Sequence, residues 1–162
     1  MSARTVVLLG ATLTTGLTAG VIALYAHTII PGLKTTDDRT FVAAFQAIDR
    51  AILNPWFMGT FFGALALTAA AAVTNRGRPA LGWVIAGLVL YLAVVLITMA
   101  VNVPLNNAVK TAGDPARIDV ARVRDDFHVA RWVAWNFVRV AASLAAFASL
   151  AWALVLDGRT GA

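Results

Sequence analysis

The chain has 162 residues, of which 60% are hydrophobic and 13% charged, and its mean hydropathy is +0.78. Soluble globular domains rarely combine so much apolar surface with so little charge. The net charge is +5, but no run of five or more basic residues occurs, so nucleic-acid binding is not expected. Cysteine is absent, which excludes disulfides and thiolate metal sites.

Long apolar runs dominate the sequence. Each is long enough to cross a hydrocarbon core about 30 Å thick, which takes about 20 residues of helix. We therefore predict an all-α fold, a four-helix transmembrane bundle forming one integral membrane domain over residues 1–162, surrounded by lipid in the cell membrane. The predicted spans are residues 5–30, 55–74, 81–101 and 132–156.

The first span carries Gly16 and Gly20 in a Gly-x-x-x-Gly spacing. Small residues at this spacing let helices approach closely, either at the seam of a homo-oligomer or inside one bundle. His27 follows near the end of the span, and we expect Pro31 and Gly32 to stop the helix there. His27 would then lie at the membrane interface, as a hydrogen-bonded anchor or as a group with a chemical role.

Residues 34–54 connect the first two spans. Their apolar residues recur at steps of three and four, which predicts an amphipathic helix of about fourteen residues, too short to cross a membrane. We expect it to lie at the interface, across the mouth of the bundle. Gln46, Arg50 and Asn54 follow one another at steps of four and would form either a polar ridge or a solvated face.

The third span places Tyr91, Thr98 and Asn102 on one helix face, and Pro104 is expected to break the helix. Asn102 and Asn106 would then either cap the broken end or line a pocket, because amides at this depth need partners. The polar segment 110–131 follows. Its mixed charges predict a solvated helix that continues through His128 into the fourth span.

The fourth span opens with Trp132, Trp135, Asn136 and Arg139, which share one face at helical spacing. Arg139 would lie about 10 Å inside this span, at 1.5 Å per residue. A cation at that depth costs at least a few kcal/mol unless it is paired. We therefore expect an anionic group, from the protein or from a ligand, to meet Arg139.

Folding brings these polar groups to the same end of the bundle, which predicts one membrane-level pocket suited to a planar, apolar molecule with an acidic oxygen. Arg139 would stabilise a phenolate or enolate, with Asn136 beside it. No metal site is expected, because the chain has two histidines and no glutamate. The residues assigned to substrate binding are Asn54, Asn102, Asn106, Trp132, Trp135, Tyr91 and His128.

Five short motifs are spread over nearly the whole chain. They are P-G-L (31–33), F-Q-A-I-D-R (45–50), N-P-W-F (54–57), N-V-P-L-N (102–106) and R-W-x-x-W-N-x-x-R (131–139). Together they resemble the integral membrane family named for anthrone oxygenases. The resemblance implies a four-helix membrane protein, and fungal relatives are associated with converting anthrones to anthraquinones with molecular oxygen. The motif positions are Asn54, Asn102, Asn106, Trp132, Trp135, Asn136 and Arg139.

The leading hypothesis is an oxygenase-like enzyme that needs no cofactor and oxidises a polycyclic phenolic substrate through its enolate. Arg139, Asn136 and His27 are the catalytic candidates, and His27 or His128 would be the base. One alternative is a non-catalytic protein in which Arg139 pairs with Asp49 or Asp125 and clamps the bundle. Another is a small haem- or quinone-binding protein, in which the two imidazoles would hold haem axially.

Overall fold

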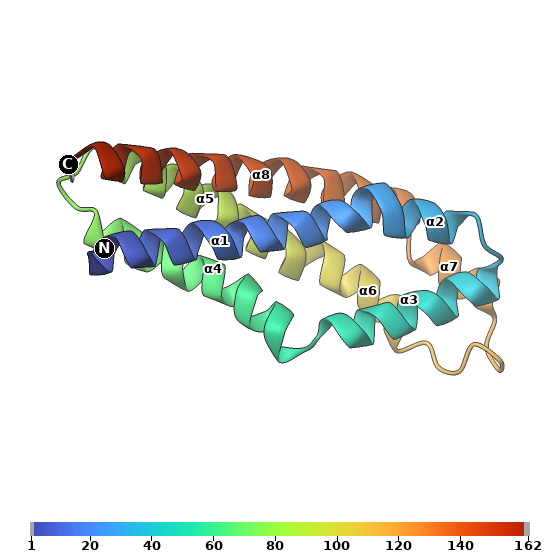
Figure 1. Ribbon diagram of the computed structural model, residues 1–162. Helices are drawn as coiled ribbons and strands as arrows, with labels where there is room; N and C mark the ends of the chain where they lie inside the picture. Colours follow the sequence, from blue (N-terminus) through green and yellow to red (C-terminus); the bar gives the residue numbers. More distant parts are fainter. Residues whose placement is uncertain (1, 161–162) are drawn as a thin grey trace.

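The computed structural model describes residues 2–160, which form helices and turns with no strand among them. Four long helices make a closed ring in which α1 contacts α4 and α8, and α5 contacts the same two helices. Successive helices run in opposite directions, and the start of α1 lies at the same end as the end of α8 (Figure 1). The four are α1 (Ala3–Leu24), α4 (Pro55–Thr74), α5 (Leu81–Ile97) and α8 (Val129–Thr160).

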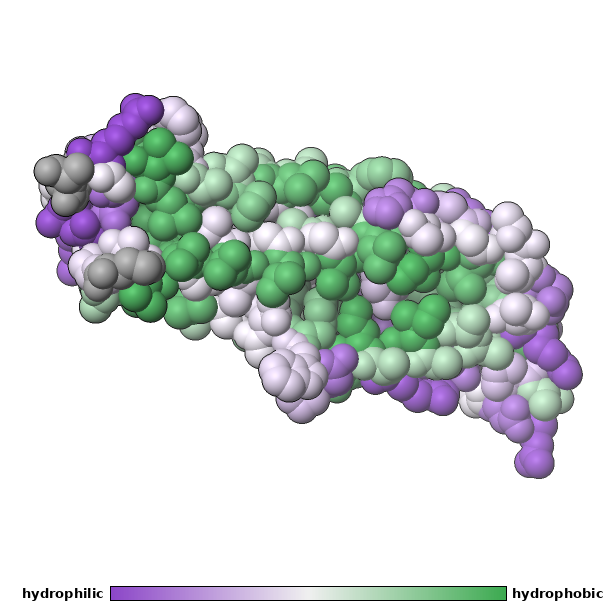
Figure 2. Space-filling model, in the orientation of Figure 1, coloured by the Kyte–Doolittle hydropathy of each residue, from purple (hydrophilic) through white to green (hydrophobic). Residues whose placement is uncertain are grey.

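Four helices are long and apolar enough to cross a membrane, as predicted. Apolar side chains cover the middle of the molecule and hydrophilic ones gather at its two ends (Figure 2). The observed bounds are wider than three of the predicted spans, because regular helix continues beyond the apolar residues. These helices are Ala3–Lys34, Pro55–Thr74, Leu81–Lys110 and Val129–Arg159.

Two of the predicted helix ends are wrong. The first helix passes Pro31 through η1 (Tyr25–Ile29) and α2 (Ile30–Lys34), and the third passes Pro104 through η2 (Thr98–Asn102) and α6 (Val103–Lys110). Each proline falls in the second position of an α segment that follows a turn of π-helix.

The π turns explain how the helices continue. A proline has no N–H, and its ring crowds the carbonyl four residues earlier in a regular α-helix. Here the wider turn intervenes, so that Ile30 N–H bonds to Tyr25 O and Val103 N–H to Thr98 O, each five residues back. In both helices the π turn begins six residues before the proline.

The short helices pack together at the end of the molecule opposite the termini, and we call α2, α3 (Asp38–Ile52), α6 and α7 (Val120–Asp126) the cap. α3 lies between the first two spans, where an amphipathic helix was predicted; its amphipathic role and its position at a membrane interface stay predictions. Asp37 caps its N-terminus by accepting hydrogen bonds from the hydroxyl and the backbone N–H of Thr40, and these bonds lower the pKa of Asp37.

The predicted continuous helix from residue 119 into the fourth span is interrupted. α7 ends at Asp126, and His128 adopts a positive φ of 48°, which is uncommon for a residue with a side chain. The turn lets Phe127 pack fully buried against Phe45 and Trp132, with ring centroids 4.5 and 6.0 Å away. Burial of this ring accounts for the break.

Gly16 serves packing inside the bundle. A Cβ atom added there would lie 2.8 Å from the ring of Phe147 in α8, whereas one added at Gly20 would meet no atom within 4 Å. Of the two glycines in the Gly-x-x-x-Gly spacing, only Gly16 therefore needs to be small within this fold.

We expect Gly16→Leu to lower the free energy of unfolding by about 1–3 kcal/mol relative to Gly20→Leu, because only the first forces extra atoms into a packed contact. Both changes gain the same helix propensity, so their difference isolates the contact with Phe147. Unfolding in mixed detergent micelles measures it. If Gly20→Leu is the more damaging change, and dissociates an oligomer, then the spacing serves a homo-oligomer seam instead.

Candidate functional site

A cavity of about 270 Å³ lies where the cap meets the four-helix ring. This volume is near the lower end of ligand pockets, which span about 300–1,000 Å³, so the cavity suits a small ligand. Both π turns contribute to its wall, and such turns are frequent at functional sites. The polar and amphipathic residues of the wall are Tyr25, Asp49, Thr98, Asn106, Asn107, Lys110, Trp132 and Arg139.

Arg139 supplies a buried cation to the inner part of this wall. Its side chain projects from α8, and the residue is 7% exposed. Nη1 donates to Thr98 Oγ1 at 3.0 Å and Nη2 donates to Asn136 Oδ1 at 2.6 Å. Nε is buried without a hydrogen-bond partner, and the guanidinium carbon lies 5.6 Å from the centroid of the Trp132 ring. The guanidinium is thus held in place by two of its five N–H donors, and its buried Nε–H is left without a partner.

No ion pair among residues 2–160 involves Arg139. The pairing with Asp49 or Asp125 that the clamp hypothesis required is therefore not formed. Asp49 instead has Lys110 Nζ 3.5 Å from its Oδ2 atom, and Asp125 is exposed on the cap. The described protein thus leaves an anion-binding role at Arg139 open to a ligand.

The partners of Arg139 are themselves oriented by the backbone. Asn136 is fully buried and its Nδ2 donates to Ile22 O at 3.3 Å, which leaves Oδ1 free to accept from the guanidinium. Thr98 donates its hydroxyl to Val94 O at 2.7 Å and accepts from Arg139 on the same oxygen. These bonds connect α8 to α1 and to η2, and they fix where the charge lies.

A second polar chain crosses the part of the wall next to the cap. Trp132 Nε1 donates to Asn106 Oδ1 at 2.7 Å, and Asn106 Nδ2 donates to Asp49 Oδ1 at 2.7 Å. The indole N–H can only donate, so it sets the orientation of the amide, and the amide in turn holds the carboxylate. Asp49 is 7% exposed, and its Oδ2 is buried without a hydrogen-bond partner.

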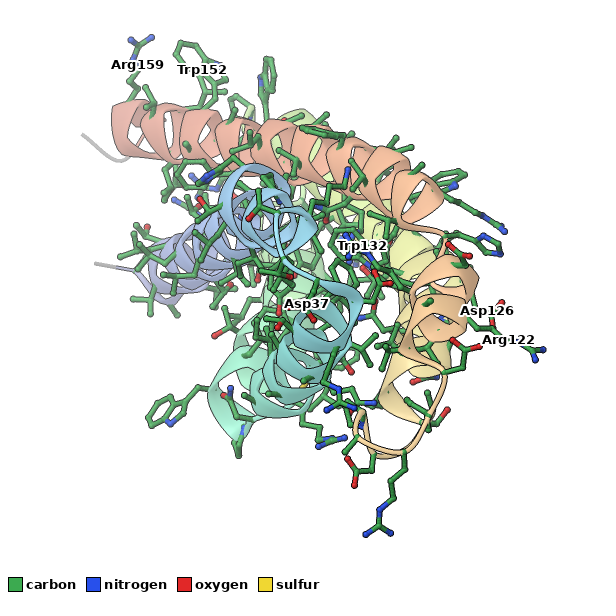
Figure 3. The ribbon with its side chains drawn as sticks, turned by 90° about the vertical axis from the view of Figure 1, so that its right-hand side faces the viewer. Asp37, Arg122, Asp126, Trp132, Trp152 and Arg159 are labelled. Carbon is green, nitrogen blue, oxygen red and sulfur yellow. The ribbon has the colours of Figure 1, made fainter. Side chains whose placement is uncertain are left out.

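Tyr25 shares this wall with Asp49 and Arg139. Its ring centroid is 6.1 Å from that of Trp132, and the residue interacts electrostatically with both Asp49 and Arg139. Figure 3 shows Trp132 directed from α8 into the interior, while Arg122 and Asp126 of the cap point away from it. The wall therefore carries the Asp49 carboxylate, the Arg139 guanidinium and the aromatic pair of Tyr25 and Trp132.

Several predicted site residues lie elsewhere. Neither histidine contributes to the cavity wall: His27 is exposed, with Nδ1 2.6 Å from Thr28 Oγ1, and His128 is exposed at the turn before α8. Trp135 is on the exposed face of α8, and Asn54 accepts from Phe57 N–H as the N-cap of α4. All four lie near the ends of apolar segments, where side chains reach solvent or lipid instead of the interior.

Asn102 and Tyr91 are buried but do not line the cavity. Tyr91 donates its hydroxyl to Phe61 O at 2.8 Å, and Asn102 Nδ2 lies 3.5 Å from Trp132 O, a long hydrogen bond. Both connect the third span to neighbouring helices. Of the residues predicted to bind substrate or act in catalysis, the structure brings Asn106, Trp132 and Arg139 to the cavity wall, with Asn136 directly behind Arg139.

Asp49, Lys110 and Tyr25 were missed as site residues. A signal for Asp49 exists in the sequence: it lies four residues after Phe45 and three before Ile52, and so on the apolar face of α3. An acid on an apolar face must find a partner when that face is buried. The partners here come from α6, which no spacing within α3 reveals.

A metal or bis-histidine haem site is not assembled in the described part of the chain. Residues 2–160 contain no group of three potential His, Cys, Asp or Glu ligands. The two imidazoles that the haem hypothesis required do not face a common cavity.

Comparison with known proteins identifies the family. The family model described as anthrone oxygenase matches residues 55–149, which is more than half of the chain. The chain belongs to the anthrone oxygenase family. No curated protein and no solved structure matches it. The region matched by the anthrone oxygenase model includes Asn106, Trp132 and Arg139, whereas Tyr25 and Asp49 come before it.

We expect Asn106→Leu to destabilise the protein, because it removes the acceptor of the Trp132 indole and the donor to Asp49. Each buried polar group left without its partner costs about 1–3 kcal/mol. The control is Asn107→Leu, the same change one residue later in α6, since the Asn107 side chain lines the cavity and makes no hydrogen bond in the described structure. Unfolding in mixed micelles compares the two; equal stability would mean that the polar chain contributes nothing measurable.

Proposed function

We propose that the cavity binds an anthrone-type polycyclic phenol and supports its oxidation by molecular oxygen. The observation that carries this proposal is the buried Arg139 in an otherwise mostly apolar wall, held by neutral partners and with no carboxylate among residues 2–160 paired to it. A ligand that becomes anionic during the reaction would supply the missing negative charge. Membership of the anthrone oxygenase family supports the same substrate class.

The reaction needs little chemistry from the protein. An anthrone loses a proton from its methylene carbon to give an electron-rich enolate, and Arg139 stabilises the negative oxygen by electrostatics and hydrogen bonding. Molecular oxygen accepts electrons from the enolate and bonds to the same carbon, which gives a hydroperoxide after protonation. Loss of water from the hydroperoxide leaves the quinone carbonyl. One oxygen atom enters the product and the other leaves as water, so oxygen is the only oxidant required.

The aromatic wall suits the ring system of such a substrate. Trp132, Tyr25 and Phe57 line the cavity, and aromatic pairs gain about 0.5–1.5 kcal/mol beyond simple burial when their geometry is favourable. Of the two tryptophans assigned to substrate binding, Trp132 lines the cavity and would stack on the ring system, whereas Trp135 is on the exposed face of α8.

We further propose that the protein crosses the cell membrane four times and that the substrate enters from the lipid. Three residues of the cavity wall are also exposed on the outside of the bundle: Leu53, Phe62 and Met99. Trp56, 87% exposed at the start of α4, has the position typical of an interfacial anchor. A sparingly soluble aromatic molecule would be concentrated in the same layer.

A structural role for Arg139 is the second candidate function. Its favouring observation is that Arg139 and Asn136 together bridge α8, η2 and α1 through buried hydrogen bonds. A clamp of this kind requires no ligand. The two roles differ in what remains when the cation is removed: a clamp predicts unfolded protein, whereas a site predicts folded protein that has lost its ligand.

We expect the purified protein to convert 1,8-dihydroxyanthrone to 1,8-dihydroxyanthraquinone in air, and Arg139→Gln to lower the protein-dependent rate by about 10²–10³-fold, as for loss of an oxyanion donor. The control is Arg159→Gln, the same change on an exposed arginine at the other end of α8, which should keep the wild-type rate. Chromatography measures the quinone, and an oxygen electrode should show one molecule of O₂ consumed for each molecule of quinone formed.

Thermal unfolding of the same samples separates the candidates. Folded Arg139→Gln without activity supports the oxygenase proposal. An inactive wild type together with unfolded Arg139→Gln and Asn136→Ala proteins contradicts it and favours the clamp.

A further inference from the structure

We propose that Asp49 is the general base of the cavity, positioned by Asn106 and accompanied by Lys110. The proposal rests on the proposed function, since it names the group that takes the substrate proton. Neither histidine expected for this step contributes to the cavity wall. Asp49 does, and it comes from the cap, outside the region matched by the family model.

The charges of the wall single out this carboxylate. Its titratable residues are Tyr25 from η1, Asp49 from α3, Lys110 from α6 and Arg139 from α8. At neutral pH the phenol, the ammonium and the guanidinium each carry their proton, so none accepts another without first losing one. Asp49 alone among the described wall residues is ready to accept a proton.

The two oxygens of Asp49 are in different situations. Oδ1 accepts from Asn106 Nδ2 at 2.7 Å, and Asn106 is itself held by the Trp132 indole. Oδ2 is buried and has no hydrogen bond, although buried carboxylate oxygens are normally satisfied. One oxygen is thus fixed by the protein, while the other lacks the donor that an acidic substrate group would provide.

Lys110 forms an ion pair with the Asp49 oxygen that has no hydrogen bond, Oδ2. Nζ lies 3.5 Å from Oδ2, which stabilises an ionised carboxylate in a mostly apolar wall. The lysine side chain is also more exposed than that of Asp49, so its long stem has room to move when a ligand arrives. The pair therefore holds a charged base in a place where an isolated carboxylate would be costly.

The proton transfer leaves the total charge of the cavity unchanged. The methylene C–H bond of the anthrone breaks, its proton goes to Oδ2 of Asp49, and the electron pair stays in the ring system as the enolate. The negative charge has then moved from the Asp49 end of the wall to the oxygen that Arg139 stabilises. Asp49 then passes this proton to the peroxide oxygen, which gives the hydroperoxide. The carboxylate next takes the second proton from the same carbon as the O–O bond breaks, and returns it to the departing hydroxide, which leaves as water.

The test measures proton removal without oxidation. The full-length protein in detergent is incubated with 1,8-dihydroxyanthrone in D₂O under strict exclusion of oxygen, and NMR follows deuterium entering the methylene carbon above the protein-free rate. We expect Asp49→Asn to lower the protein-dependent exchange by about 10²–10⁴-fold, the usual contribution of a general base. The control is Asp126→Asn, the same change on an exposed carboxylate of the cap, which should exchange like the wild type.

Two further variants keep the test decisive where Asp49→Asn folds poorly. Asp49→Glu retains a carboxylate and should recover part of the exchange. Lys110→Met leaves the bond between Asp49 and Asn106 in place and should lower the exchange by less than Asp49→Asn does, because the carboxylate itself is still present. Exchange that falls as far in Lys110→Met as in Asp49→Asn, or wild-type exchange in Asp49→Asn, overturns the assignment.

The outcomes separate this inference from the proposed function. If exchange depends on Asp49 but no quinone forms in air, the assignment of Asp49 as base is supported and the oxygenase function is contradicted. If the Asp49→Asn protein still forms quinone, the oxygenase function is supported and the assignment of Asp49 as base is contradicted. Wild-type protein that neither exchanges the anthrone nor oxidises it rejects both.

Discussion

The structure depends on how polar groups inside an apolar bundle find partners. Arg139 is the extreme case, because an unpaired cation at this depth would cost several kcal/mol. Among the described residues, its hydrogen-bond acceptors are neutral oxygens of Thr98 and Asn136. Both of these residues in turn donate to backbone carbonyls. The result is a guanidinium whose position is fixed but whose charge is not neutralised by a protein carboxylate, and this distinguishes a site from a buried ion pair. A buried ion pair of the ordinary kind is found at the other end of the molecule, where Asp157 pairs directly with Arg4 at 2.6 Å.

The prolines determine where that site is. A wider π turn precedes each of Pro31 and Pro104, and the two turns carry Tyr25 and Thr98 to the same cavity. The core is continuous on either side of this level. Towards the termini it is built from Phe61, Tyr91 and their neighbours. On the side of the cap it is built from Phe41 of α3, together with Phe127 and Trp132 at and after the turn into α8. The cavity lies where one packing arrangement gives way to the other, and so the irregular backbone is found where a ligand would be needed.

The sequence was most informative where a pattern lies within one helix. Apolar runs predicted the four long helices, and helical spacing placed Arg139 inside the last of them. The anionic group expected to meet Arg139 is not found among residues 2–160 and stays a prediction for a ligand. The sequence was misleading where contacts between distant segments override the preferences of single residues. Proline rules placed helix ends at Pro31 and Pro104, although a change of helix type absorbs both residues. Chemistry alone suggested His27 and His128 as bases, but both lie where side chains leave the interior. Asp49 was considered only as a partner of Arg139, because its actual partners, Asn106 and Lys110, are supplied by α6, far away in sequence.

The division of the cavity wall between the ring and the cap has a consequence for the chemistry. Arg139 comes from a long helix that is fixed along its length, whereas Asp49 and Lys110 come from the short helices of the cap. A site that moves negative charge from one side to the other needs both ends held apart yet close enough for one small molecule to reach them. A carboxylate inside a bundle of apolar helices has to be paired or protonated, as Asp157 is paired directly with Arg4, and is then not free to act as a base. By drawing the carboxylate from the cap and the cation from the ring, the fold brings opposite charges to a common cavity without neutralising them against each other.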